Sequence, residues 1–387
     1  MIYGANGYTG RLAARFAKEH QFTPILAGRR ADEILPLTRQ LGFESRIFDL
    51  ADPAVVARNL EDMTAVLHCA GPFSATSRSM LAGCLRAKTH YLDITGEIAV
   101  FEDIHARSEE FRNAGIVVIP GVGFDVVPTD CLAAMLKREL PSATHLKLAF
   151  KSRYGKLSPG TTKTMVEGLP EGGRIRMNGR IVKVPAAYKI ETIPFAEDLS
   201  APGVTIPWGD VSTAFYSTGI PNIEIFLGAS DKQIKQMQLP GILRWLIGLT
   251  PVQAFMKAQI AKRVKGPTDE QRARDEIYLY GEVWDEAGNK VALRLRTREA
   301  YTLTAESAVT ATVKVMSGGL TPGAYTPSMA FGPDYVLELE GTKLTSPQWG
   351  EDRVMYADST YLTPLCFAGS VANRSPARAP ERMPDIP

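Results

Sequence analysis

Three glycines at the start of the chain constrain its fold more than any other feature. They lie in Gly4-Ala5-Asn6-Gly7-Tyr8-Thr9-Gly10, which follows a short apolar run and precedes an amphipathic helical pattern. Glycines at this spacing allow a tight turn and a close approach of the backbone to a pyrophosphate, while the following helix presents its N-terminal N–H groups. This order predicts a dinucleotide site. The expected cofactor contacts are Gly4, Asn6, Gly7, Tyr8, Thr9 and Gly10.

Two arginines after the second predicted strand indicate which dinucleotide binds. The strand 23–27 is followed by Gly28-Arg29-Arg30, and Arg29 lies 19 residues after Gly10. An acidic residue at about this distance holds the ribose 2′-hydroxyl of NAD, whereas arginine suits a 2′-phosphate. We therefore expect NADP, although a solvated turn would use the same arginines. Only three residues precede Gly4, which indicates a clipped first strand or a start upstream of Met1.

Length and composition favour a globular protein that is neither nucleic-acid-binding nor secreted. The chain has 387 residues, 45% of them hydrophobic, which suits a protein of more than one domain. Its formal net charge is only +2, so no overall field attracts nucleic acid. The N-terminus shows no secretory signal pattern, and the four cysteines lack metal-binding spacing. These features predict a cytoplasmic protein with free thiols and no metal site.

The first 127 residues alternate strands and helices in the rhythm of a parallel, doubly wound α/β sheet of the Rossmann type. We expect its later strands at 45–49, 65–70, 91–94 and 115–120. Asp52 before Pro53 predicts a capped helix, and Thr129 before Asp130 predicts another that ends near Leu140. Together these elements predict one dinucleotide-binding domain.

From about residue 145 the pattern changes to β-rich runs separated by polar segments. The runs 277–284 and 290–295 flank a turn sequence and predict a hairpin, and 304–316 predicts a capped helix stopped by two glycines. We expect a second, mixed α/β domain with antiparallel pairing. The predicted division is 1–127 for NADP binding, 128–300 for substrate and oligomerisation, 301–345 returning to the first domain, and 346–387 as an extension that is disordered from about 375.

Loops at the carboxyl ends of the predicted strands supply the remaining cofactor candidates, because open α/β sheets bind ligands at this edge. Ala70, Gly71 and Pro72 follow the fourth strand, where glycine lets the backbone pass close to the cofactor ribose and proline fixes the loop. An ordinary turn would use the same residues. Asp49 ends the third strand, and it accepts a hydrogen bond either from the adenine amine or from the next segment as a cap.

Four titratable residues at the same edge are candidates for a proton donor. They are Tyr91, Asp93, Glu97 and Asp125. Hydride transfer to a C=C or C=N bond requires a proton for the other atom, which a carboxyl group or a tyrosine can supply. Helix caps also favour aspartate, so each carboxylate has a structural alternative. No tyrosine is followed by lysine four residues later, which excludes a Tyr-x-x-x-Lys mechanism.

Several motifs together resemble the saccharopine dehydrogenase-like oxidoreductases. They are the glycine loop, Ala70-Gly71-Pro72-Phe73, Tyr91-x-Asp93-x-x-Gly96-Glu97, Gly121-x-Gly123-Phe124-Asp125-x-x-Pro128-x-Asp130, and the segments 158–161, 206–210 and 216–222. The resemblance covers roughly residues 1–340 and implies an NADP-type Rossmann domain with a mixed α/β second domain to which the late helix returns. The chain is most similar to a subgroup that includes trans-acting enoyl reductases, from which no catalytic residue is carried over.

Aromatic side chains favour an apolar substrate. Trp208, Phe215 and Tyr216 suggest an apolar wall for an acyl chain, with Phe73 as a further contact, although core packing explains them equally well. A diacidic substrate would need converging arginines, whereas those in 174–180 resemble a solvated hairpin. The predicted activity is NADP(H)-dependent reduction of a C=C or C=N bond in an apolar metabolite, such as an acyl thioester. The alternatives are a saccharopine-type amino-acid dehydrogenase and a non-catalytic nucleotide-binding protein.

One amphipathic segment bears on partners. Residues 241–249 are apolar, and the helix predicted from Thr250 has an apolar face beside a basic edge. Its basic residues are Lys257, Lys262, Arg263 and Lys265. Such a helix suits an anionic membrane surface or a carrier-borne acyl group, whereas a buried or dimer-forming helix shows the same pattern. A peripheral membrane contact through 241–265 and a homodimer are therefore both expected alternatives.

Overall fold

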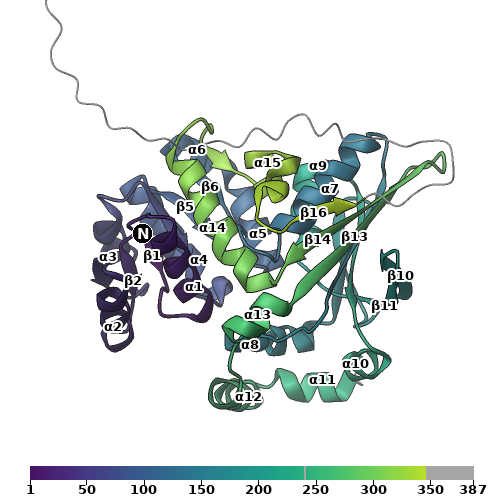
Figure 1. The fold of residues 1–387 in the computed structure, drawn as a ribbon, viewed down its shortest axis with the longest axis horizontal. Coiled ribbons are helices and arrows are strands. Elements are labelled where there is room, and N and C mark those ends of the chain that lie inside the picture. The colour runs from purple at the N-terminus through teal and green to yellow at the C-terminus, as the bar shows by residue number, and fades with distance from the viewer. Residues whose placement is uncertain (239–240, 346–387) are drawn as a thin grey trace, which may run out of the picture. The chain divides into compact units, whose positions relative to one another are not determined.

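The structure is a computed structural model that describes residues 1–238 and 241–345 (Figure 1). Two sheets organise this part of the chain. The first has seven strands in the order β15-β6-β5-β4-β1-β2-β3, and the second has nine. The predicted fold class, a Rossmann-type parallel sheet with a second mixed α/β domain, is confirmed. The predicted extension 346–387, with its disordered end, lies outside the described residues.

The first sheet is built from short strands that alternate with helices. Its strands are β1 (Ile2–Tyr3), β2 (Leu26–Gly28), β3 (Ser45–Ile47), β4 (Ala65–His68), β5 (His90–Asp93), β6 (Val117–Ile119) and β15 (Gly323–Ala324). The helices between them are α1 (Tyr8–Glu19), α2 (Ala31–Leu41), α3 (Pro53–Leu60), α4 (Phe73–Ala87), α5 (Ile98–Ala106) and α6 (Ser108–Ala114). All pairings in this sheet are parallel, so the strands end at one edge.

Capping side chains mark the start of two predicted helices, and a third predicted cap is absent. Asp52 accepts a hydrogen bond from the Ala54 N–H at 2.8 Å, which confirms the predicted cap of α3. The cap predicted for Thr129 is wrong, because α7 (Val127–Glu139) already begins two residues earlier. α14 (Ala300–Met316) also begins before the predicted start, since the Glu299 carboxylate accepts hydrogen bonds from the first backbone N–H groups of the helix.

The second sheet is mainly antiparallel, with one parallel pair between β12 and β7. Its strands are β7 (His145–Ser152), β8 (Gly173–Met177), β9 (Arg180–Val184), β10 (Ile190–Ala196), β11 (Leu199–Thr205), β12 (Asn222–Gly228), β13 (Glu276–Trp284), β14 (Lys290–Arg298) and β16 (Lys343–Thr345). β13 and β14 form the predicted hairpin. Asp285 closes its turn by accepting hydrogen bonds from the N–H groups of Ala287 and Asn289.

The remaining helices cover the second sheet and connect it to the first. They are α8 (Pro159–Gly168), α9 (Asp210–Thr218), α10 (Asp231–Met237), α11 (Gly241–Gly248), α12 (Thr250–Arg263), α13 (Asp269–Arg274), α15 (Pro327–Phe331) and the 3-10 turns η1 (Leu169–Glu171) and η2 (Pro333–Glu338). α14 packs on α1, β4 and β14, and one core cluster contains residues of both sheets. The segment after residue 300 thus lies against the first sheet, while the exact domain boundaries stay a prediction.

Arg176 corrects the expectation of a solvated arginine hairpin. β8 and β9 do form a hairpin, but Arg176 is only 4% exposed. Its guanidinium donates to the Val211 carbonyl at 2.8 Å and to Glu102 at 3.0 Å, and it lies over the ring of Phe215. Arg176 therefore ties the hairpin to α5 and α9 and is occupied by protein partners.

Candidate functional site

Close packing around the glycine loop requires two of its glycines. Gly4 has φ of +79°, and a Cβ there would lie 2.8 Å from the backbone nitrogen of Ala70. A Cβ on Gly10 would lie 2.4 Å from the Gly4 carbonyl oxygen. The Gly4 N–H donates to Ala27 at 2.8 Å, which fixes the loop to β2. The first turn of α1 is thereby held against the end of β1 and the loop after β4.

The N-terminus of α1 fits a pyrophosphate. The helix begins with Tyr8, Thr9 and Gly10. Its first intrahelical hydrogen bond runs from the Arg11 N–H to the Gly7 carbonyl, so the N–H groups of the three preceding residues have no acceptor within the helix. Within the described residues no side chain caps this helix. Free N–H groups at a helix N-terminus, together with the helix dipole, bind phosphate groups. The residues present therefore match what a dinucleotide needs.

The region after β2 contains both predicted phosphate ligands and one acidic residue that the sequence analysis missed. Arg29 and Arg30 are exposed and directly precede α2. Glu33 forms an ion pair with Arg30 at 2.6 Å and accepts a hydrogen bond from the Asn6 amide at 2.8 Å. Arg29 has no ion pair within the described part of the chain. The Arg-x-x-Glu spacing on a helix was the signal for this pair.

Substituting Arg29 with alanine is expected to weaken NADPH binding about tenfold to a hundredfold, because a hydrogen bond to a charged group contributes about 1.5–3 kcal/mol. Arg30→Ala should cost less, since Glu33 already occupies that guanidinium. Fluorescence titration with NADPH and NADH measures both effects. NADH affinity should change little in either variant. An equal loss for both cofactors would contradict the assignment of Arg29 to the 2′-phosphate.

The other cofactor candidates lie beside the glycine loop or near the end of β3. The carbonyls of Ala70 and Pro72 accept hydrogen bonds from the Thr76 hydroxyl at 2.8 and 3.1 Å, so α4 holds this loop in place. Gly71 and Pro72 are exposed at the carboxyl edge of the sheet. Asp49 accepts a hydrogen bond from the Ala51 N–H at 3.0 Å, so its capping alternative is present, and its contact with adenine stays a prediction.

Tyr91 and Asp93 hold two loops together from a fully buried position. The Tyr91 hydroxyl donates to Asp93 at 2.6 Å, and the other Asp93 oxygen accepts from the N–H groups of Thr95 and Gly121 at 2.9 Å. Burial raises the pKa of Asp93 to about 6. Both side chains are 0% exposed, so this geometry does not favour either as a donor to a substrate.

Glu97 and Phe73 also have partners within the first domain. The Glu97 carboxylate accepts hydrogen bonds from the N–H groups of Phe73 and Ser74 at 2.7 and 2.9 Å, which satisfies the N-terminus of α4. The Phe73 ring is buried and packs edge-on against His68. Their positions therefore support the structural alternatives more than the predicted catalytic and substrate roles.

Asp125 differs from the other three candidates. It follows β6, and its carboxylate has no hydrogen-bond partner among residues 1–238 and 241–345. A Cβ on Gly96 would lie 2.7 Å from one of its oxygens, so the carboxyl group lies against the loop after β5. Burial raises the pKa of Asp125 to about 6. A partly exposed carboxyl group with this pKa can hold a proton and release it near neutral pH.

An aromatic row adjoins the Asp125 loop. Phe124 packs edge-on against Phe150, whose ring centroid lies 4.7 Å from that of Trp208. The residue after Trp208 approaches the Gly96 loop, because a Cβ on Gly209 would lie 3.3 Å from the Gly96 carbonyl oxygen. The indole N–H of Trp208 is buried without a hydrogen-bond partner in the described structure. Trp208 therefore lies close to the loops that carry Gly96 and Asp125, and its contact with a substrate stays a prediction.

Tyr216 lies at the other end of α9, away from Trp208. Its ring stacks on His105 at 3.9 Å, and its hydroxyl donates to Glu102 at 3.3 Å. Phe215 packs under the Arg176 guanidinium. These two aromatic side chains belong to the contact between α9, α5 and β8, which supports the core-packing alternative for them.

Tyr301 is a site residue that the sequence analysis missed. Its hydroxyl accepts a hydrogen bond from the Ser158 N–H at 2.6 Å and bonds to the Thr161 hydroxyl at 2.9 Å. Its ring packs edge-on against Tyr8 of the glycine loop. Burial raises the pKa of Tyr301, and the negative charge of Asp125 adds to this rise. The starts of α14, α8 and α1 thus meet near Asp125.

Comparison with known proteins identifies the first domain. Residues 1–119 match the family model of the saccharopine dehydrogenase NADP binding domain. The first 119 residues therefore resemble this family of NADP-binding domains. The match confirms NADP as the cofactor type of this saccharopine dehydrogenase-type domain, in agreement with arginine rather than an acidic residue after β2.

Curated relatives match a limited part of the chain. A trans-acting enoyl reductase of Mycobacterium leprae is 27% identical over 150 residues, and a saccharopine dehydrogenase-like oxidoreductase of Bos taurus is 24% identical over 150 residues. These alignments cover 36% and 34% of this chain. They span 35% of the length of each relative, so the whole-protein activity of the relatives does not transfer directly.

A solved structure matches over both domains. Saccharopine dehydrogenase (L-Glu forming) from Saccharomyces cerevisiae superimposes with a TM-score of 0.62, covering 89% of this chain and 99% of its own. Its sequence is 12% identical, so the likeness shows a shared fold. The saccharopine dehydrogenase-type domain and the second sheet therefore occur together in a known architecture.

Proposed function

We propose that the protein is an NADPH-dependent oxidoreductase that reduces a C=C bond in an apolar acyl thioester. The observation that carries this proposal is Asp125, a partly exposed carboxyl group that has no hydrogen-bond partner in the described part of the chain and whose pKa is raised to about 6. It lies at the carboxyl edge of an NADP-binding sheet and next to the aromatic row that ends in Trp208. Similarity over 150 residues to a trans-acting enoyl reductase supports the same reaction class.

The glycine loop and Arg29 would hold NADPH, which when bound would supply a hydride for the β-carbon of the conjugated C=C bond, with the thioester carbonyl taking the displaced electron pair as an enolate. Asp125 then donates its proton to the α-carbon, which restores the carbonyl and leaves a carboxylate that takes up a proton from water. The net change converts one enoyl thioester, one NADPH and one proton into an acyl thioester and NADP⁺. Tyr8 and Tyr301 define the side of the site next to the glycine loop.

The surroundings of Asp125 favour an apolar substrate over a diacidic amino acid. The adjacent aromatic side chains are Phe124, Phe150 and Trp208. Arg176, the buried arginine of the β8–β9 hairpin, already binds Glu102 and two carbonyls. Reduction of a C=N bond would use the same carboxyl group and is the second candidate.

A homodimer stays a prediction that sedimentation can test.

The proposal predicts NADPH oxidation with enoyl thioesters. Purified protein is mixed with NADPH and 2-enoyl thioesters of short, medium and long chains, and absorbance at 340 nm is followed with mass analysis of the product. We expect a gain of two hydrogen atoms and faster turnover with longer chains. NADH serves as the cofactor control, and a preformed imine tests the C=N candidate. NADPH binding without turnover of any thioester or imine would favour the non-catalytic alternative and contradict the proposal.

A further inference from the structure

α11 and α12 expose an unusual concentration of large apolar side chains. Ile242 is 73% exposed, Trp245 63% and Phe255 64%, and Leu243 and Leu246 are also exposed. These five are among the 16 large hydrophobic side chains exposed in the described residues. No residue of α12 is buried. Single exposed apolar residues are ordinary, but several on neighbouring helices are typical of an interaction site.

The α11–α12 pair is attached to the second domain along one side. The Gln253 amide donates to the carbonyls of Val166 in α8 and Ile247 in α11 at 2.9 and 3.0 Å. Lys257 forms an ion pair with Glu167 of α8. Figure 1 shows the two helices beside each other at the lower edge, below α8 and α13. Among the described helices, none has the length and apolar character needed to cross a bilayer.

The charge of this segment indicates what it binds. Between Asp231 and Asp269 the sequence contains seven lysines and arginines and no acidic residue, whereas the whole chain has a net charge of only +2. Two copies of the chain that met through this face would bring like charges together. An anionic lipid surface attracts the same charges and accommodates exposed apolar side chains among its acyl chains.

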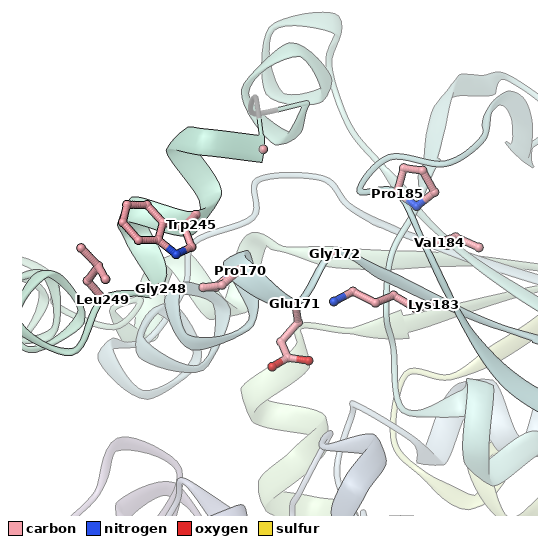
Figure 2. Close-up of a pocket in the computed structure, with 10 residues that line it drawn as sticks. Pro170, Glu171, Gly172, Lys183, Val184, Pro185, Trp245, Gly248 and Leu249 are labelled. Atoms are coloured by element: carbon pink, nitrogen blue, oxygen red, sulfur yellow. The ribbon is translucent and has the colours of Figure 1, made fainter.

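A pocket beneath α11 adds a place for an apolar group. It has a volume of about 570 Å³ and lies between α11, η1 and β9. Figure 2 shows Trp245 and Leu249 on one side and Lys183 on the other, with Glu171 between them. Tryptophan at an apolar surface with a nearby cation is typical of side chains at the boundary between acyl chains and head groups.

The segment after α12 connects this surface to the candidate site. The Tyr8 hydroxyl donates to the Pro267 carbonyl at 2.6 Å, and Arg272 donates to Tyr8 at 3.0 Å. A Cβ on Gly266 would lie 2.3 Å from the Tyr8 ring, so this segment touches the start of α1 directly. A surface that binds α12 would therefore lie near the glycine loop.

We propose that α11 and α12, residues 241–263, with the basic residues beside them dock the protein on an anionic lipid surface. Ile242 and Phe255 enter the apolar layer, Trp245 lies at its boundary with the head groups, and the exposed Lys262, Arg263 and Lys265 contact the phosphates. The exposure and charge of the segment support this docking, which does not depend on the proposed reduction. It would place a lipid-dissolved substrate beside the protein that reduces it.

Co-sedimentation with vesicles tests the proposal on the full chain. The vesicles contain phosphatidylcholine alone or with phosphatidylglycerol. We expect binding to the anionic vesicles only, and high salt should weaken it because exposed charges are screened. Lys262→Glu with Arg263→Glu should lower the partition coefficient more than about tenfold, since each basic residue near an anionic surface contributes about 1 kcal/mol. Arg39→Glu with Arg58→Glu, on exposed helix positions of the first domain, is the charge-matched control and should bind normally.

Apolar variants separate insertion from charge attraction. Ile242→Ser with Phe255→Ser should weaken binding at least as strongly, while Met316→Ser, at another exposed position, should not. Tryptophan emission should shift to shorter wavelength with anionic vesicles, and Trp245→Phe should remove that shift. Equal binding of all variants would overturn the proposal. A dimer in sedimentation that the apolar variants abolish, without vesicle binding, would also overturn it and assign the face to a second copy.

Discussion

Replacing Asp125 with asparagine is expected to lower kcat for thioester reduction by about two to four orders of magnitude, because general acid catalysis contributes a factor in this range. Asparagine keeps the size of the side chain but has no carboxyl proton to donate. The first measurement is single-turnover NADPH oxidation near pH 6, with NADPH affinity measured separately. NADPH affinity should change little, since the predicted cofactor contacts lie on other loops.

The pH profile distinguishes this role from a structural one. Burial raises the pKa of Asp125 from 3.8 to about 6, and the protonated form is the donor. In the wild-type protein kcat/KM should be constant below about pH 6 and fall about tenfold per pH unit above it. This decline should be absent from the residual activity of Asp125→Asn. A decline of the same shape in both proteins would assign it to another group.

Stability should follow the same titration. The folded protein binds the Asp125 proton more tightly than the unfolded chain does, because the pKa is higher in the folded state. The contribution of this group to the free energy of unfolding is therefore fully present below about pH 4 and is lost as the pH rises through about 6. Asp125→Asn should lack that part of the pH dependence. Asp52→Asn is the matched control, since asparagine also caps helices and α3 should remain intact.

The cofactor half of the site was readable from the sequence because its geometry is local. Gly4 and Gly10 are six positions apart, and the loop they shape needs only β1, α1 and the neighbouring strands. Arg29 follows β2 directly, so the strand order fixes its place. Short segments at the carboxyl edge of a parallel sheet meet regardless of what lies between them. The NADP prediction depended on nothing else.

The choice among the acidic candidates required the folded structure. Asp93, Glu97 and Asp125 are equivalent in the sequence, since each follows or ends a strand. Asp93 accepts hydrogen bonds from backbone N–H groups of its own loop and of the loop after β6, and Glu97 accepts them from the start of α4. In the described structure no N–H group donates to Asp125. Which N–H group reaches which carboxylate depends on loop conformation, and no spacing rule encodes it.

Long-range contacts account for the remaining differences. Arg176 looked solvated because its partners, Glu102 and Val211, lie 74 and 35 positions away. Tyr301 was missed because only the return of α14 to the first sheet brings it to Tyr8. Their shared aromatic character placed Phe215 and Tyr216 with Trp208 in one group, whereas in the fold they contact different elements.

Replacing Gly10 with alanine is expected to lower NADPH affinity more than about a hundredfold and to destabilise the fold by about 1–3 kcal/mol, the usual cost of overpacking. The new Cβ would lie 2.4 Å from the Gly4 carbonyl oxygen and 2.8 Å from the Ala5 Cα. Both contacts are with backbone, so no side-chain rotation relieves them. The first turn of α1 must move away from the loop, and its N–H groups then leave the positions that bind a pyrophosphate.

Thermal unfolding with and without NADPH measures both effects of Gly10→Ala. NADPH should raise the Tm of the wild-type protein, because a ligand that binds only the folded state stabilises it, and should leave the Tm of the variant unchanged. Gly168→Ala is the matched control, since no atom lies within 4 Å of its Cβ position and its φ of −75° suits alanine. If NADPH raised the Tm of Gly10→Ala as much as that of the wild type, the pyrophosphate would have to bind elsewhere, because the loop cannot keep its present geometry around an added methyl group.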